Sequence, residues 1–115
     1  MDRKNNSVET FSDRVLRAAL AVPFGKVTTY GRIARAAGGG AFASQSITTI
    51  LSKFIIKKKK DNPNIPFHRI VYADGRVWIN DKYRKERMKL YKKEGIEIDS
   101  NDKIKNFNDI LFEFE

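Results

Sequence analysis

Residues 28–54 read TTYGRIARAAGGGAFASQSITTILSKF, and this stretch decides the fold. Its first part predicts a helix over about residues 30–37, with a threonine as N-cap and three glycines to end it. A second helix is expected over roughly residues 42–54, because four apolar side chains recur at the spacing of one helix face: Ile47, Ile50, Leu51 and Phe54. Two short helices joined by a glycine turn are the pattern of a helix-turn-helix.

The face of the second helix opposite this apolar stripe carries small polar side chains and no charges. It presents Gln45, Thr48, Thr49 and Ser52. A solvated helix face usually carries lysine and glutamate, which have better helix propensity than serine and threonine. Short polar side chains let a helix approach a polar surface closely, so we expect this face to contact DNA. The alternative is an ordinary helical hairpin with an indifferent surface.

Further elements are expected on both sides of this stretch. Helical periodicity predicts a helix over residues 11–22, capped by a threonine or serine and ended by a proline. An Asp-Gly pair between two β-rich runs, residues 69–72 and 76–79, predicts a β-hairpin. A basic helix is expected over 82–93, and residues 96–98 suit a terminal strand. The remaining tail allows either a short docking helix or a partly disordered segment.

Charge and composition point to a soluble protein with a polyanionic partner. The chain of 115 residues is 41% hydrophobic and carries a net charge of +9. From Glu94 onward, seven acidic residues face two lysines, so the positive charge is concentrated before that point. Such a field favours phosphate backbones or anionic membranes. Lys57 and Lys58 begin a run of four lysines beside the second helix, where they are placed to contact phosphates, although a plain solvated loop is the alternative.

Several classes of protein are excluded by what the sequence lacks. It has no cysteine, which rules out disulfides, thiolate metal sites and a thiol nucleophile. No apolar run approaches the length of a transmembrane helix, and the N-terminus does not read as a secretory signal. We therefore expect a cytoplasmic protein without cofactor or metal. No membrane partner is expected either, since the lysine run lacks an accompanying apolar helix face.

Four segments occur in order along the chain and carry a family resemblance: FSDRVL at residues 11–16, VPFGKVTTYGRIA at 22–34, IPFHRI at 65–70 and EGI at 94–96. Together they resemble the C-terminal DNA-binding domain of O6-alkylguanine-DNA alkyltransferases over about residues 10–98. The resemblance implies a mainly α-helical, winged helix-turn-helix-like domain with a small β-hairpin. We expect this domain to span residues 1–99, followed by an acidic, aromatic tail over residues 100–115.

Phe67 stands where that family carries its nucleophile. In the alkyltransferases a cysteine between the proline and histidine of a Pro-Cys-His-Arg motif accepts the alkyl group. The histidine, assisted by the glutamate of a late Glu-Gly pair, generates the thiolate; His68 and Glu94 match these two positions. Because a phenyl ring has no lone pair to donate, Phe67, His68 and Glu94 are expected to be the remnant of an active site without catalysis. The chain is thus similar to the alkyltransferase-like proteins, the non-enzymatic branch of the family.

The resemblance also implies a pocket for a flipped-out base. Its residues would be Tyr30, Phe67, Ile70, Trp78 and Asn80, with backbone carbonyls near Phe67 and Ile70 reading the guanine edge. Tyr30 matches the tyrosine that crowds the target phosphate, but a core-packing role is the alternative. Trp78 is either a lid on the pocket or ordinary packing of the hairpin.

The DNA contacts implied by the resemblance include two departures from the family pattern. We expect contacts from Thr29 and Tyr30, the polar helix face and the lysines, while Arg69 serves either the fold or a phosphate. The family inserts an arginine finger into the space left by the flipped base, and alignment puts Gln45 there. Glutamine lacks the charge and stacking plane of a guanidinium. The Asn-Pro hinge of the family is also displaced here by the lysine insertion, so a hinge role for residues 62–63 is not assigned.

These expectations define three competing functions. The first is a monomeric, non-enzymatic protein that binds O6-alkylguanine in double-stranded DNA and promotes nucleotide-excision repair with the proteins of that pathway. It would be associated with the nucleoid, or nuclear in a eukaryote. The second is a helix-turn-helix regulator or nucleoid protein without damage specificity. The third, an enzyme using His68 and Glu94 to activate water, is disfavoured because the resemblance already accounts for both residues.

Overall fold

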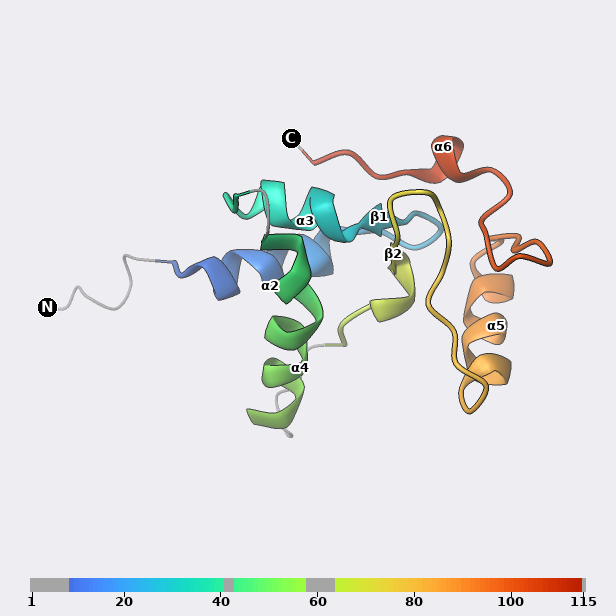
Figure 1. The fold of residues 1–115 in the computed structure, drawn as a ribbon, viewed down its shortest axis with the longest axis horizontal. Helices are drawn as coiled ribbons and strands as arrows, with labels where there is room; N and C mark the ends of the chain where they lie inside the picture. Colours follow the sequence, from blue (N-terminus) through green and yellow to red (C-terminus); the bar gives the residue numbers. More distant parts are fainter. Residues whose placement is uncertain (1–8, 41–42, 58–63, 115) are drawn as a thin grey trace, which may run out of the picture.

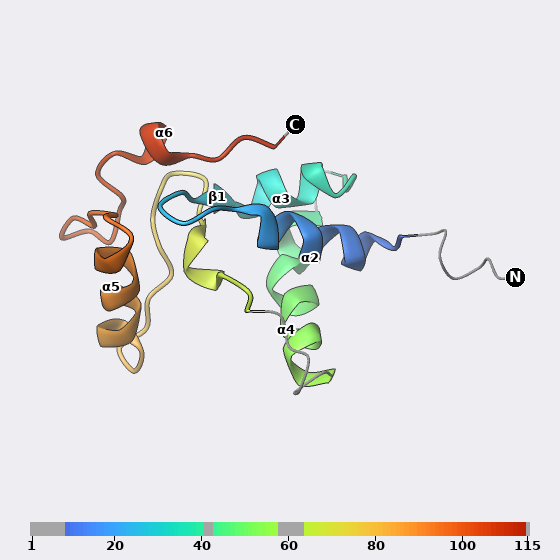
Figure 2. The ribbon, with the colours of Figure 1, turned by 180° about the vertical axis from the view of Figure 1, so that it is seen from behind.

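The computed structural model describes residues 9–40, 43–57 and 64–114. Its elements are, in chain order, α2 (Phe11–Ala21), β1 (Thr28–Thr29), α3 (Tyr30–Ala36), the 3₁₀ turn η1 (Ala43–Ser46), α4 (Ile47–Lys57), the 3₁₀ turn η2 (Phe67–Arg69), β2 (Ile70–Val71), α5 (Arg84–Lys93) and α6 (Phe107–Ile110). Figure 1 shows α4 and α5 on either side of the segment that contains η2 and β2, and the reverse view in Figure 2 agrees. The predicted fold class, mainly helical with a minor β component, is confirmed.

Helix α2 begins with a complete capping box. The Thr10 hydroxyl accepts from the Asp13 N–H at 3.1 Å, and the Asp13 carboxylate accepts from the Thr10 N–H at 3.1 Å. These two bonds satisfy backbone donors that the first turn leaves free. The helix ends one residue earlier than expected, because Val22 before Pro23 is extended.

Helices α3 and α4 form the predicted helix-turn-helix. Thr29 caps α3 by accepting from the Arg32 N–H at 3.1 Å. Gly39 is required in the turn, since a Cβ there would lie 2.6 Å from the Cβ of Ala43. The second helix was expected as one piece over 42–54, but it opens with the 3₁₀ turn η1, and the α-helix proper starts at Ile47. The tight glycine turn brings Ala43 back against Gly39, and the regular α-helix begins only after this close contact.

The predicted antiparallel hairpin is wrong in its pairing. Residues 70–71 instead pair in parallel with β1, in the register Thr28↔Ile70 and Thr29↔Val71. A tight turn does form around Gly75, where the Tyr72 N–H donates to the Arg76 carbonyl at 2.9 Å. The second arm pairs with the tail, however, because the Val77 N–H bonds the Asp102 carbonyl at 2.8 Å. Residues distant in sequence therefore supply the backbone partners that a hairpin would have supplied locally.

The C-terminal tail docks on the rest of the molecule. It runs past α6 along β1, where the Phe112 N–H donates to the Val27 carbonyl at 2.7 Å (Figure 1). Ile104 is buried, and Phe107 packs directly against Gly75. Of the two alternatives for the tail, the structure therefore shows docking with a short helix. The expected strand at 96–98 is reduced to a single bridge between Ile98 and Ile104.

Two apolar clusters hold the molecule together, and β2 joins them, because Ile70 belongs to the first and Val71 to the second. One cluster gathers α2, α3 and α4, with these buried residues: Val15, Ala18, Ala19, Ile33, Ala34, Ala37, Ile47, Leu51, Ile65 and Ile70. The other lies between α5, the loop before it and the tail, with Val27, Val71, Val77, Tyr91, Ile96 and Ile104. Within the described residues, no helix is long and apolar enough to cross a membrane.

Candidate nucleic-acid interface

The turn η2 presents consecutive side chains to two different spaces. Pro66 and Ile65 before it are buried, and its 3₁₀ hydrogen bonds run from the Arg69 N–H to the Pro66 carbonyl and from the Ile70 N–H to the Phe67 carbonyl. Phe67 lines a large pocket on one side, whereas His68 lines a smaller cavity of about 300 Å³ on the other. The turn thus separates the two sides of the site.

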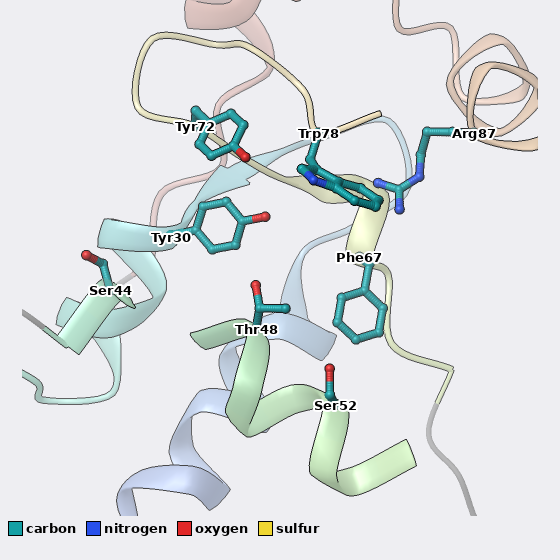
Figure 3. Close-up of a pocket in the computed structure, with 8 residues that line it drawn as sticks. All are labelled: Tyr30, Ser44, Thr48, Ser52, Phe67, Tyr72, Trp78 and Arg87. Carbon is teal, nitrogen blue, oxygen red and sulfur yellow. The ribbon is translucent and has the colours of Figure 1, made fainter. Parts of the chain in front are cut away.

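The large pocket has a volume of about 560 Å³, within the range of ligand-binding pockets. Its lining comes from several parts of the chain: Tyr30, Ser44, Thr48, Ser52, Phe67, Tyr72, Trp78 and Arg87 (Figure 3). Four of these eight residues are aromatic. The rings of Tyr30 and Tyr72 lie 5.7 Å apart between centroids, and the Arg87 guanidinium lies 5.7 Å from the centre of the Trp78 ring.

One edge of the pocket is formed by the polar face of α4. In Figure 3 the hydroxyls of Thr48 and Ser52 point from this helix toward the aromatic side chains. Thr49 and Gln45 are exposed beyond the pocket, on the same helical region. Stacking surfaces therefore lie next to hydrogen-bonding groups that are free to approach a polar ligand.

On the other side of η2, Glu94 organises a buried ionic network. Its carboxylate is 4% exposed and accepts from Arg69 in bidentate geometry, with Nε–Oε1 at 3.0 Å and Nη2–Oε2 at 2.8 Å. It also lies 2.5 Å from His68 Nε2 and accepts from the Gly25 N–H at 2.8 Å. Arg69 donates in addition to the Val22 carbonyl at 2.9 Å. This network joins the end of α2, η2 and the end of α5.

The electrostatics of the network follow from burial and these bonds. Burial alone would raise the pKa of the Glu94 carboxyl, but hydrogen bonds from Arg69, His68 and the Gly25 N–H outweigh it and lower the pKa to about 2. Burial lowers the pKa of the His68 imidazole, against the opposing effect of Glu94. Burial also raises the pKa of the Tyr91 hydroxyl to about 12. Tyr91 therefore stays protonated and donates to the His68 carbonyl at 2.7 Å.

The structure brings together some of the residues predicted for the pocket and DNA contacts. Tyr30, Phe67, Trp78, Thr48 and Ser52 meet in one pocket. The Ile70 side chain belongs to the buried core, and the Asn80 side chain accepts from the Tyr83 N–H at 3.0 Å, so neither lines the pocket.

The remaining predicted contacts have other placements. Thr29 is buried as the cap of α3. Arg69 donates to the Glu94 carboxylate and to the Val22 carbonyl, which gives it a role in the fold, while a contact with a phosphate stays a prediction. Lys57 ends α4, and its side chain lies outside the described part of the structure, as does Lys58 entirely.

Sequence reasoning missed Ser44, Tyr72 and Arg87 as lining residues. Tyr72 was placed in a hairpin arm, and only the parallel pairing of β2 brings it opposite Tyr30. Arg87 was one of seven basic residues in 82–93, with nothing local to single it out. The one available signal was its spacing of four residues from Tyr91, which puts both side chains on the same helix face.

The groups that line the pocket can stack on a ligand and hydrogen-bond to it. The pocket offers rings, hydroxyls and one guanidinium, and the chain contains no cysteine. Among the described residues, no cluster of histidine and carboxylate side chains could hold a metal ion.

The fold and this site define a class of DNA-binding domain. Residues 10–96 match the family described as "6-O-methylguanine DNA methyltransferase, DNA binding domain", and the chain belongs to this family.

The chain is similar to two relatives and to one solved structure. The DNA base-flipping protein of Escherichia coli (strain K12) is 25% identical over 103 residues, 90% of this chain and 75% of that protein. Alkyltransferase-like protein 1 of Schizosaccharomyces pombe is 29% identical over 96 residues, 79% of this chain and 81% of that protein. The crystal structure of S. pombe Atl1 in complex with damaged DNA containing O6-carboxymethylguanine has the same fold, with a TM-score of 0.68 at 22% identity. The match covers 93% of this chain and all of that one.

Proposed function

We propose that the protein binds O6-alkylguanine as a base flipped out of double-stranded DNA and does not transfer the alkyl group. The observation that carries this proposal is the aromatic pocket beside α4 with Phe67 in its wall. Phe67 occupies the position at which the resemblance to the alkyltransferases places the acceptor cysteine. The names of the two relatives, a DNA base-flipping protein and an alkyltransferase-like protein, support the same reading.

In this proposal the pocket binds the base through stacking and edge contacts. Tyr30, Phe67 and Trp78 supply ring surfaces, and stacking on aromatic side chains contributes roughly 1–3 kcal/mol per base. The carbonyls of the 67–70 segment are the candidates for reading the guanine edge. The Phe67 carbonyl already accepts from the Ile70 N–H, but a carbonyl oxygen has a second lone pair for a ligand.

The helix α4 would lie in a groove of the duplex. Its exposed Thr49, together with Gln45 before it, extends the polar face that the pocket begins. Gln45 would hydrogen-bond the base left unpaired by flipping. Lys57 and Lys58 would contact phosphates and make the affinity fall with salt.

Downstream, we propose that the bound protein marks the lesion for nucleotide-excision repair and acts as a monomer. The protein would then act on chromosomal DNA, in the nucleoid or in a eukaryotic nucleus. Stimulated incision of an O6-alkylguanine duplex by purified nucleotide-excision repair proteins tests this step. Unchanged incision would contradict the repair role and leave lesion binding intact.

A helix-turn-helix DNA-binding protein without damage specificity is the second candidate. It is favoured by one observation, the exposed Gln45 in place of the family's arginine finger. A glutamine gives less help to flipping than a guanidinium, which can stack in the gap.

Competition binding separates the two candidates. Duplexes of identical sequence with one guanine or one O6-methylguanine are titrated against the protein. Tighter binding of the O6-methylguanine duplex is expected, with no increase in the intact mass of the protein after incubation. Equal affinities would eliminate damage recognition and leave general DNA binding, whereas a mass increase would contradict the absence of alkyl transfer.

A further inference from the structure

Arg87 brings a positive charge into a pocket whose other walls are rings and hydroxyls. In Figure 3 its side chain enters from α5 toward Trp78, and its Cζ lies 5.7 Å from the centre of the indole ring. The residue is half-buried, unlike Lys85 and Lys89 on the same helix, which are exposed. A charge held in such a setting interacts more strongly than one on the outer face of the helix.

Helix α5 holds Arg87 close to the turn that carries Phe67. Tyr91 lies one helical turn after Arg87, on the same face, and its hydroxyl bonds the His68 carbonyl at 2.7 Å. This bond anchors α5 to η2. The positive charge of Arg87 contributes to the low pKa of His68, for which burial is the largest cause. Arg87 therefore stands at the Phe67 end of the pocket.

No carboxylate neutralises this charge within the described residues. The ion pairs there join Arg17, Arg32, His68, Arg69, Arg76 and Arg84 to their partners, and none includes Arg87. Glu94, the buried carboxylate at the end of the same helix, already accepts from Arg69, His68 and Gly25. The pocket thus has a positive end and no acid of its own.

We propose that Arg87 makes the pocket selective for guanine lesions whose O6 substituent ends in a negative charge. This inference rests on the proposed function. Because Phe67 occupies the position that the resemblance gives to the alkyl-accepting cysteine, the O6 substituent of a bound base would point toward Phe67. A carboxylate in that position would receive charge-assisted hydrogen bonds from the planar guanidinium, whose geometry suits bidentate contact. A methyl group has no acceptor and would contact only the rings of Phe67 and Trp78.

The test compares three duplexes of identical sequence with guanine, O6-methylguanine or O6-carboxymethylguanine at one position. Wild-type protein is expected to bind the carboxymethyl duplex roughly 10-fold or more tightly than the methyl duplex. The Arg87→Gln variant is expected to lose this preference, and Arg87→Lys to retain part of it. Thermal melting of each variant confirms that it is folded.

Lys89→Gln is the matched control, because it removes the same charge from the exposed face of α5. A carboxymethyl group adds a negative charge that the whole basic protein attracts. If this general attraction caused the preference, Lys89→Gln would reduce it as much as Arg87→Gln. The proposal requires that only the Arg87 variants change the ratio of the two affinities.

Failure of this inference is distinguishable from failure of the proposed function. Equal affinity of wild-type protein for guanine and O6-methylguanine would contradict damage recognition of neutral lesions. Preference for both lesions over guanine, with equal affinity for the two, would overturn only the selectivity. An equal loss for all three duplexes in Arg87→Gln would make Arg87 a general DNA contact and would also overturn it.

Discussion

Phe67 and His68 are neighbours in the chain, yet they face two regions of opposite physical character. The region in front of Phe67 is an open pocket of about 560 Å³, lined by aromatic rings and hydroxyls. The region behind it is a closed ionic network in which a 4% exposed carboxylate has several protein donors. In an alkyltransferase these two regions would serve a single reaction. Here the first is available to a ligand, whereas the second is occupied by its own hydrogen bonds.

The difference separates a side of the site that is open to a ligand from a side that holds the fold together. The ionic network ties η2 to α5 and to the turn at Gly25. The two regions should therefore respond to different perturbations, one in stability and the other in binding.

The largest effect is expected from breaking the network. In Glu94→Gln, the half-buried Arg69 and the buried His68 would lose their anionic partner, and breaking a buried ion pair costs about 3 kcal/mol or more. Urea denaturation should show a loss of this size in the free energy of unfolding. The control is Glu97→Gln, an exposed glutamate on the same segment, expected to change stability by less than about 0.5 kcal/mol. A loss below about 1 kcal/mol in Glu94→Gln would mean that the network does not hold the turn.

A slightly smaller effect is expected from pH. The pKa of His68 is lower in the folded protein than its value of 6.5 in the unfolded chain. Acidification below pH 6.5 therefore favours the unfolded chain. Glu94 contributes stability above its unfolded value of 4.5, and this contribution is lost as pH falls toward about 2. For Glu94, the difference between the unfolded and folded pKa values corresponds to at most about 3 kcal/mol of stability.

Denaturation measured between pH 7 and pH 3 checks this dependence. Stability should fall with decreasing pH through both windows, and Glu94→Gln should flatten the lower one. A wild-type stability that is constant from pH 5 to pH 3 would contradict the low pKa assigned to Glu94.

The smallest change in stability is expected from a substitution in the pocket, which should weaken binding instead. Trp78 is 45% exposed, so Trp78→Ala should lower the free energy of unfolding by less than about 1 kcal/mol. Loss of its ring should weaken binding of an O6-methylguanine duplex roughly 10- to 100-fold, by the usual contribution of base stacking. Tyr83→Ala is the matched control, because Tyr83 is equally exposed and does not line the pocket. If both variants bind equally well, Trp78 is not a wall of the base site.

The helices were predicted well because their signals are local. The threonine caps of α2 and α3 and the glycines after α3 act within a few residues, and each is present. The β pairing was not predicted, since Ile70 and Val71 had a local partner across the turn and a distant one in β1. Both partners satisfy the same backbone groups, and only packing selects between them.

The site was predicted in part for the same reason. Phe67 and His68 belong to one motif. The resemblance to the alkyltransferases added Tyr30 and Glu94, which are distant from this motif in sequence. Tyr72 and Arg87 carry no motif, and their place in the pocket depends on how β2 and α5 pack.

By itself, the sequence determined that this protein has a helix-turn-helix and no thiol to accept an alkyl group, because composition and local periodicity are properties of the chain alone. Only the tertiary structure decided that Arg69 bonds Glu94, that the tail docks, and that Arg87 enters the pocket. These outcomes are competitions between partners far apart in sequence. Which partner wins depends on the geometry of the assembled core, and no local pattern encodes it.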